Sequence, residues 1–277
     1  MQPVSGLTHE PDPVRDLARF VKYLERGDPF RFVRFSDGEF IIIRNHELEI
    51  SEAGMKSPEG ETSHKLPRYD FKVFDPSRHQ QVREDLIASL RHKSEAYFIG
   101  LPSSHNLGQE VNRDLGLSMH GGLDKQVTFS DLLINSNYRL FLRNVVPILK
   151  RIDEITVVGN HRMRPANINP NWRLVAIPDD AMSAYSAVIE ATIEQLLALP
   201  PKNCVLASAS SLSNVLGMHV DVERPDLTFI DVGTALHPFT GMGTNDRDYH
   251  SLLSSFWGVG GLRRLRYRFA PHYRIRW

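Results

Sequence analysis

The second half of the chain alternates short apolar segments with longer amphipathic ones. The expected order is a strand at 155–158, a strand at 174–177, a helix at 181–197, a strand at 204–207, a helix at 210–219 and a strand at 227–230. Apolar strands interleaved with helices predict a mostly parallel sheet with helices on both faces. This pattern restricts the chain to an α/β, Rossmann-like architecture.

The first half repeats the step from helix to strand. Pro13 suits a first helical turn, Leu17, Val21 and Leu24 recur at helical spacing, and Gly27 suits the position just after a helix, which together predict a helix between Pro13 and Gly27. Residues 51–70 are rich in Ser, Glu, Gly, Pro and Lys without a period, which indicates a long surface loop and a natural lid. Other expected elements are a strand at 30–35, a turn at 36–38 before a short helix at 40–43, a helix at 76–93, strands at 96–101 and 126–129, and one or two helices at 132–149.

Charge and composition exclude several classes of protein. Thirty-three basic residues balance thirty-three acidic ones, so no whole-molecule field favours nucleic acid. The only cysteine, Cys204, cannot form an internal disulfide, and the first residues lack a signal-peptide pattern, so we expect a cytoplasmic protein. No apolar run approaches the about 20 residues that span a bilayer. We expect one domain over 1–277, with a basic C-terminal extension from about 258.

Ligands of parallel α/β sheets bind beyond the carboxyl ends of the strands, so the residues there are the ones to read for chemistry. Asp37 and Glu39 follow the first strand with a glycine between them, and they can converge on one side of a tight turn. Paired carboxylates offer hard oxygen ligands to Mg²⁺ or Mn²⁺. An Asp-x-Glu match is expected about once by chance in such a chain. The second match, Asp221-Val222-Glu223, lies between a helix and the start of a strand, at the wrong edge of the sheet.

The stretch Arg34-Phe35-Ser36-Asp37-Gly38-Glu39 resembles the Arg-Phe-Gly-Asp-Gly-Glu opening of glycosyltransferases of the GT-D fold. Further segments resemble that family in the same order along the chain, over about residues 30 to 236. They are Phe98-Ile99-Gly100-Leu101-Pro102, Thr156-Val157-Val158-Gly159, Leu206 to Leu216, and Ile230-Asp231-Val232-Gly233.

The resemblance implies a metal-dependent transferase that moves a sugar from a nucleoside diphosphate donor, a UDP-sugar first among them, in the synthesis of a surface glycan or glycoconjugate. It implies Mn²⁺ or Mg²⁺ at Asp37 and Glu39, and a glycan, peptide or lipid-linked acceptor. The chain departs from the family after Gly233, where Thr234-Ala235-Leu236-His237-Pro238 and a basic tail replace His-Ile-Asp and an acidic, aromatic C-terminus. This departure leaves the acceptor open.

Several residues beyond strand ends are candidates for binding the donor. Arg34, Arg162 and Arg164 can clamp phosphate oxygens with planar guanidinium groups, although Arg34 can instead face solvent from its strand. Gly159 precedes the arginine-bearing loop in the resemblance. Ser208, Ser210 and Ser211 open a helix whose N–H groups favour a phosphate, or they cap that helix.

A transferase that acts by direct displacement needs a general base near the acceptor hydroxyl. The candidates beyond strand ends, each of which can alternatively cap a helix, are Asp179, Asp180, Asp231 and His237.

The tail and the remaining patterns leave alternatives. Arg264-Leu265-Arg266-Tyr267-Arg268-Phe269 alternates strictly, as in a charged edge strand or a face that meets an anionic acceptor at the inner membrane surface. No Gly-x-Ser-x-Gly elbow or His-x-x-x-His pair supports a serine hydrolase or a zinc enzyme. The rival functions are a catalytically silent sugar-nucleotide-binding or scaffold module, and a metal-dependent phosphohydrolase.

Overall fold

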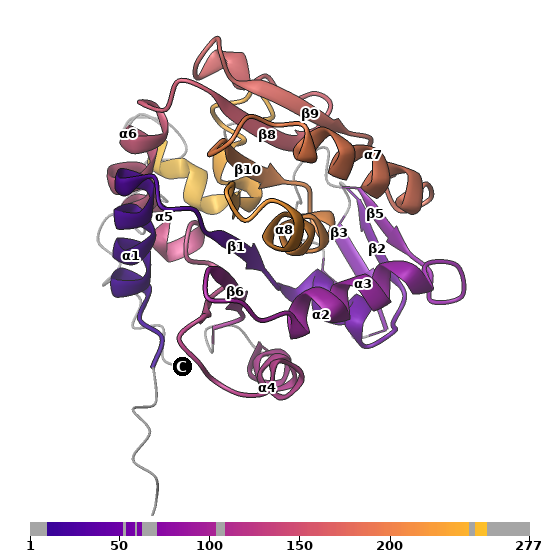
Figure 1. Ribbon diagram of the computed structural model, residues 1–277. Helices are drawn as coiled ribbons and strands as arrows, with labels where there is room; N and C mark the ends of the chain where they lie inside the picture. Colours follow the sequence, from indigo (N-terminus) through magenta and orange to yellow (C-terminus); the bar gives the residue numbers. More distant parts are fainter. Residues whose placement is uncertain are drawn as a thin grey trace, which may run out of the picture.

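The computed structural model describes residues 10–51, 54–58, 60–62, 71–103, 109–243 and 247–253. A seven-stranded sheet in the order β7-β6-β1-β11-β10-β8-β9 forms its centre, and every neighbouring pair is parallel (Figure 1). The predicted α/β sheet is confirmed. Its strands are β1 (Arg31–Arg34), β6 (Tyr97–Leu101), β7 (Val127–Phe129), β8 (Ile155–Asn160), β9 (Arg173–Ile177), β10 (Cys204–Ser208) and β11 (Thr228–Asp231).

Helices cover both faces of this sheet, and each face has its own hydrophobic core. One core joins the sheet to α2 (Asp37–Ile43), α3 (Gln80–Arg91), α7 (Tyr185–Leu197) and α8 (Leu212–Glu223). The other core joins it to α1 (Pro13–Arg26), α5 (Tyr138–Leu140) and α6 (Val146–Leu149). Strands buried on both faces must be apolar throughout, which is why they read as continuous hydrophobic runs.

The first helix shows how the sequence sets an element's ends. The Asp12 side chain accepts a hydrogen bond from the Arg15 N–H at the start of α1, and Gly27 ends the helix with φ 68°. Phe20 on its buried face stacks on Phe30 with 4.8 Å between ring centroids. Burying such a side chain contributes roughly 2–3 kcal/mol, so this contact fixes α1 against the sheet.

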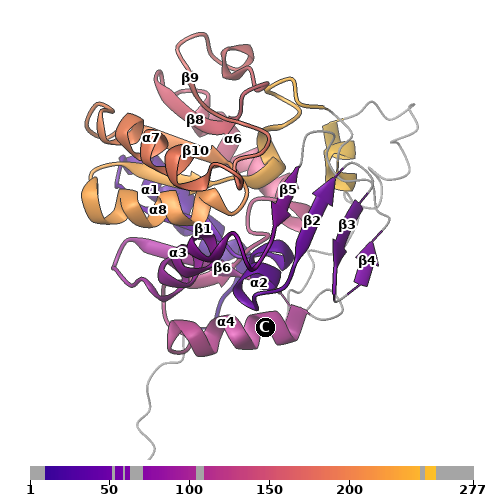
Figure 2. The same cartoon turned by 90° about the vertical axis from the view of Figure 1, so that its right-hand side faces the viewer.

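The region predicted as a loop contains a second sheet, which corrects that expectation. Its antiparallel order is β4-β3-β2-β5, with β2 (Leu48–Ser51), β3 (Gly54–Ser57), β4 (Gly60–Thr62) and β5 (Lys72–Phe74). The strands are three or four residues long and poor in β-branched residues. They are therefore too short to show the alternation of apolar and polar residues that predicts a strand. The sheet stands beside the main one (Figure 2), while residues 63–70 of the predicted lid lie outside the described residues.

Two further elements differ from expectation. The one or two helices predicted over 132–149 are two short helices, α5 and α6, with a 3₁₀ turn at Asn135–Asn137 before them and a π-helical turn at Phe141–Val145 between them. Pro147 has no N–H to donate to the preceding turn, and this interrupts the regular α-helical ladder. Helix α4 (Gln109–His120) was not predicted, because it buries Asn112, Gly116 and His120 and exposes Val111.

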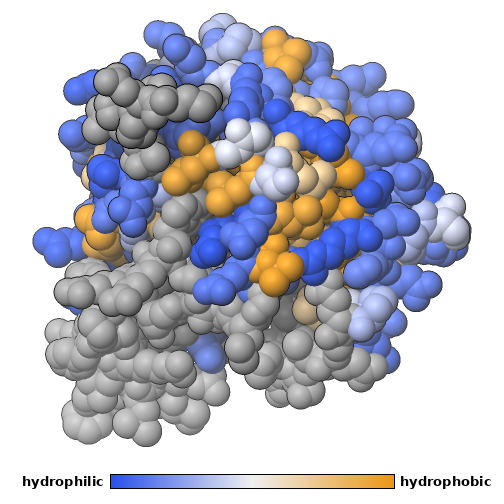
Figure 3. Space-filling view, turned by 90° about the horizontal axis from the view of Figure 1, so that it is seen from below, coloured by the Kyte–Doolittle hydropathy of each residue, from blue (hydrophilic) through white to orange (hydrophobic). Residues whose placement is uncertain are grey.

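The surface and the helix lengths of the described residues bear on contact with a membrane. No helix among the described residues is long and apolar enough to cross a membrane. Seen from below, hydrophobic residues gather near the middle of the coloured surface, with hydrophilic residues around them (Figure 3). The arginine-rich segment from about 258, and its predicted contact with a membrane, lie outside the described residues.

Candidate functional site

The predicted site begins directly after β1, where α2 starts without an intervening turn. Ser36 is the N-cap and Asp37 the first helical residue, so the expectation of a tight turn at 36–38 is wrong. Glu39, in the first turn of α2, bends back and accepts a hydrogen bond of 3.0 Å from the Ser36 N–H. This capping arrangement satisfies a backbone donor that the helix leaves unpaired. Asp37 is half-buried beside it.

Glu39 is the centre of a buried polar triad with Lys72 and Ser211. Lys72 donates from Nζ to Glu39 Oε1 over 3.1 Å and to Ser211 Oγ over 2.6 Å, and Ser211 Oγ donates to the same Glu39 oxygen over 2.7 Å. Burial by itself raises the pKa of the Glu39 carboxyl, but the Lys72 charge and the hydrogen bonds from Ser211, Lys72 and Ser36 together hold it below its usual range. Glu39 is therefore an ionised carboxylate in an ion pair.

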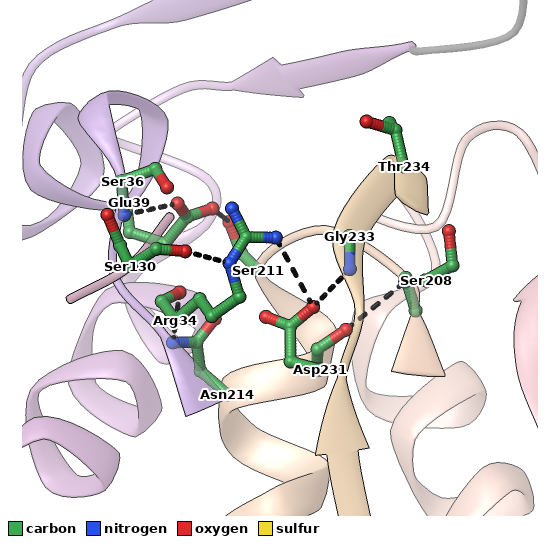
Figure 4. A network of polar contacts seen from close by, with 12 residues as sticks. Arg34, Ser36, Glu39, Ser130, Ser208, Ser211, Asn214, Asp231, Gly233 and Thr234 are labelled. Carbon is green, nitrogen blue, oxygen red and sulfur yellow. Dashed lines mark hydrogen bonds and ion pairs between the residues drawn. The ribbon is translucent and has the colours of Figure 1, made fainter. Parts of the chain in front are cut away.

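Arg34 lies next to this triad and is only 8% exposed, so the alternative that it faces solvent is wrong. Its Nε donates to the Ser130 carbonyl, and its Nη1 lies 3.9 Å from an Asp231 carboxylate oxygen (Figure 4). Gly233 has φ 50°, and a Cβ built there would be 2.0 Å from Arg34 Nη1. Glycine at 233 therefore leaves the room that the guanidinium fills.

Asp231 ends β11, the strand beside β1, and its carboxyl is buried. Burial raises its pKa to about 6, with a further rise from the Glu39 charge, against the opposing effects of Arg34 and of the Gly233 N–H that donates to it. A carboxyl with this pKa exchanges its proton near neutral pH, as a general base must.

The far end of the same edge carries a second cluster beyond β8 and β9. Asn160 donates to Asp179 Oδ1 over 2.8 Å, and Arg162 donates to the same oxygen. The hydrogen bond from Arg162 holds the pKa of Asp179 below its usual range, and that from Asn160 adds to it. Asp180 is exposed and accepts from the Ser183 N–H over 3.4 Å. Of the two, Asp179 is thus a paired anion and Asp180 a turn residue.

The remaining predicted residues lie between or beside these clusters. Ser208 Oγ lies 3.3 Å from His237 Nε2, just beyond β10. Ser210 is exposed with φ 52°, and its carbonyl accepts from the Ser213 N–H. Arg164 folds back onto the His161 and Met163 carbonyls at 3.1 and 3.0 Å. A Cβ at Gly159 would lie 2.4 Å from the Met163 sulfur, so packing alone accounts for this glycine.

Sequence reasoning missed Lys72, and with it the partner of Glu39. The signal was the alternation in Phe71-Lys72-Val73-Phe74, which places the lysine on the same side of the strand as buried Phe74. The second Asp-x-Glu match, Asp221-Val222-Glu223, lies at the opposite edge of the sheet, as expected. Asp221 pairs there with Arg31 and with His92 Nε2, the latter at 2.7 Å.

A cavity of about 350 Å³ joins the two clusters. Phe71, Lys72 and Val73 line it from β5 and the residue before it, and Asp179 and Asp180 line it from beyond β9. Phe71 is 45% exposed and Val73 51% exposed, so the cavity combines apolar surface with carboxylates. It opens beside the carboxyl edge of the main sheet, where α/β proteins bind their ligands.

These features define the class: an α/β protein with charged side chains gathered across the carboxyl ends of its parallel strands. Two solved structures share the fold. A selenomethionine-substituted domain of unknown function 1792 aligns with a TM-score of 0.50 at 12% identity over 79% of this chain and 77% of that chain. A new glycosyltransferase of the same domain type, from Streptococcus sanguinis, aligns with a TM-score of 0.50 at 13% identity over 79% of this chain and 80% of that chain.

The sequence itself matches no protein-family model and no curated protein. The two structural matches establish that the chain has the fold of domain of unknown function 1792, and the resemblance to a glycosyltransferase is confirmed at the level of fold.

The residues around Glu39 can be tested for their fit to the expected Mn²⁺ or Mg²⁺. Glu39 Oε1 already accepts from an ammonium and a hydroxyl, and Oε2 accepts from a backbone N–H. A metal ion on this carboxylate would face Lys72 Nζ at roughly 4 Å, where like charges repel by several kcal/mol even at an effective dielectric near 20. No group of three His, Cys, Asp or Glu side chains in the described part of the chain can hold a metal. The triad as it stands does not fit a divalent ion at Glu39.

Proposed function

We propose that this protein is a glycosyltransferase that takes a sugar from a nucleoside diphosphate donor. The observation that carries the proposal is the continuous row of polar residues beyond five adjacent strands, β1, β11, β10, β8 and β9. The row comprises the Arg34–Asp231 pair, the Glu39–Lys72–Ser211 triad, the Ser208–His237 contact and the Asn160–Arg162–Asp179 cluster. The glycosyltransferase that shares the fold supports the same assignment.

The charges of this row suit a diphosphate. Arg162 is 37% exposed on its loop, and its guanidinium can exchange Asp179 for a phosphate oxygen, which a planar guanidinium binds well. Lys72 and Asp179, the partner of Arg162, both line the cavity. A donor diphosphate held between Lys72 and Arg162 would place its sugar against Phe71 and Val73, whose apolar surface suits the C–H face of a sugar ring.

Asp231 is the proposed general base. As an acceptor hydroxyl oxygen forms its bond to the anomeric carbon, Asp231 takes the hydroxyl proton, and the bond from that carbon to the diphosphate breaks with its electron pair leaving on the diphosphate. Arg34, beside Asp231, keeps part of the carboxyl population ionised and so ready to accept a proton. The UDP-sugar donor, the glycan, peptide or lipid-linked acceptor and the cytoplasmic location stay predictions.

The test is a binding titration of UDP, GDP and ADP against the full-length protein, followed by the same titration with Arg162→Ala. The proposal expects one nucleoside diphosphate to bind in the micromolar range and the variant to bind it about tenfold more weakly. Absence of binding by all three would refute it. Glu39 would have to leave Lys72 before it could bind the expected Mn²⁺ or Mg²⁺.

A further inference from the structure

Lys72 is a fully buried ammonium at the position where the Asp-x-Glu pattern leads one to expect a metal. Its side chain is 3% exposed. Its Nζ would lie 3.5 Å from a Cβ built on Gly38, so the ammonium stands over Asp37-Gly38-Glu39 itself. With Glu39 and Ser211 it forms a closed triad in which each member bonds to both of the others. A buried charge is tolerated only when it is paired and hydrogen-bonded in this manner.

The small sheet holds Lys72 in this place. Lys72 pairs with Ile50 in the β2–β5 ladder, which fixes its backbone. Leu48 and Ile50 come within 3.7 and 3.9 Å of the same Cβ position on Gly38, so the face of β2 packs on the start of α2. Strand alternation then turns Lys72 inward and leaves Val73 about half exposed. The sheet therefore presents the Lys72 ammonium to Glu39, and both Lys72 and Val73 line the cavity.

We propose that Lys72 is the resident cation of this site, in place of a divalent metal ion on Glu39, and that it binds the diphosphate of the donor directly. The proposal rests on the function proposed above. Glu39 and Ser211 account for two of the three N–H donors of the ammonium, and the third is assigned to a phosphate oxygen. The triad is formed before the donor arrives, so little reorganisation accompanies binding.

Two consequences distinguish this arrangement from a metal site. A nucleoside diphosphate should bind equally well with and without Mn²⁺, because the positive charge belongs to the chain. Removal of the ammonium should leave the Glu39 charge without its counter-ion and leave Oε1 with one hydrogen bond, from Ser211, while Oε2 keeps the hydrogen bond from the Ser36 N–H. The Lys72→Met variant should then acquire the divalent-ion dependence that the wild-type protein lacks, since hard carboxylate oxygens become available.

The experiment is a calorimetric titration of UDP, GDP and ADP, one at a time, into the full-length protein in EDTA and in Mn²⁺. Mn²⁺ alone is titrated in parallel and followed by electron paramagnetic resonance. For the wild-type protein, we expect the Kd of the nucleoside diphosphate to agree within about twofold between the two buffers. We expect no binding of Mn²⁺ alone to the wild-type protein at concentrations on the order of 100 micromolar. In EDTA, Lys72→Met should bind the nucleoside diphosphate at least about tenfold more weakly than the wild-type protein. In Mn²⁺, the variant should recover this affinity. Lys72→Arg should retain most of the binding in EDTA, because it keeps the charge.

The matched control is Lys93→Met, which removes a lysine that is 51% exposed and pairs with Asp124 after α3. It should leave every value unchanged. Nucleoside diphosphate binding that requires Mn²⁺ in the wild-type protein would overturn the inference and leave the proposed function standing, and so would wild-type Mn²⁺ binding that Glu39→Gln abolishes. These two readouts hold even if Lys72→Met does not fold. Failure of every nucleoside diphosphate to bind in either buffer would overturn the proposed function and the inference with it.

Discussion

The guanidinium of Arg34 lies 3.9 Å from the carboxylate of Asp231, and both side chains are buried at the ends of neighbouring parallel strands. Burial nevertheless dominates over this attraction and raises the pKa of Asp231 to about 6. The pair therefore contains a fixed positive charge and a carboxyl that is partly protonated near neutral pH. Its behaviour with pH provides the first test of the site.

The kcat/KM of the transferase reaction should fall by about tenfold for each pH unit below pH 6. The reason is that protonated Asp231 cannot take the proton of the acceptor hydroxyl. Asp231→Asn should lower kcat roughly 100-fold or more at pH 7.5 and remove this limb of the profile. A pH profile recorded on both proteins checks the assignment. A variant that keeps the wild-type limb would show that another group is the base.

The same pKa predicts a change in stability. The folded-state pKa of Asp231 lies above the unfolded value near 4, so the folded protein holds a proton that the unfolded chain releases between about pH 4 and 6. This contribution is complete below about pH 4 and is lost as the pH rises through about 6. Urea unfolding measures the free energy of unfolding at pH 5 and at pH 7.5. From pH 5 to pH 7.5, this free energy should fall more in the wild-type protein than in Asp231→Asn. Equal losses would contradict the raised pKa.

Gly233→Ala should disturb Arg34 as well as the local backbone. Position 233 has φ 50°, which costs alanine about 1 kcal/mol, and its Cβ would overlap the guanidinium. Gly27→Ala is the matched control, because Gly27 has φ 68° with nothing within 4 Å of the added Cβ. Thermal unfolding should show a clearly larger loss for position 233, together with weaker activity. Equal losses at the two positions would mean that Arg34 has room to move.

Arg162→Ala should raise the KM for the donor about tenfold, because the guanidinium is proposed to bind the donor phosphate. It should change the free energy of unfolding little, because the guanidinium is partly exposed. Arg173→Ala removes an arginine that is 63% exposed at the opposite end of β9, where it faces Glu154 at 3.5 Å. That control should behave as the wild-type protein in steady-state kinetics. A similar rise in KM for both variants would indicate a general electrostatic effect.

The Glu39–Lys72 pair should couple strongly in stability. Removing one member of a buried ion pair costs about 3–5 kcal/mol because the other charge is left unpaired. Glu39→Gln and Lys72→Met should each destabilise by about this amount, and the double variant by clearly less than their sum. A double-mutant cycle in urea measures the difference. Additive losses would show that the two side chains do not form a pair in solution.

The sequence was informative wherever one periodicity dominated. Residues 155–230 alternate apolar strands with helices, and the observed β8 to β11 and α7 to α8 follow that order. Gly27 marked a helix end because only a left-handed residue closes α1 there. The positions of Asp37, Glu39 and Asp231 at strand ends followed from the same alternation, since parallel strands place their carboxyl ends at one edge.

Other parts of the fold depend on contacts between distant segments. The four short strands between Leu48 and Phe74 have no period of their own, and pairing with one another stabilises them. Lys72 is 33 residues from Glu39 and Ser211 is 172 residues from it, so no local pattern predicts that the three meet. The buried state of Arg34 likewise depends on Gly233 and on the Ser130 carbonyl, both far away in the chain.

The most direct test of the central claim is to incubate the full-length protein with a panel of nucleoside diphosphate sugars and identify the products by liquid chromatography and mass spectrometry. A glycosyltransferase predicts release of the nucleoside diphosphate from one donor, with the sugar moved to water or an added acceptor, and loss of that release in Asp231→Asn. Inorganic phosphate or a nucleoside monophosphate as the product would instead indicate a phosphohydrolase. An intact donor that binds without turnover would indicate a silent binding module, and either result would contradict the account.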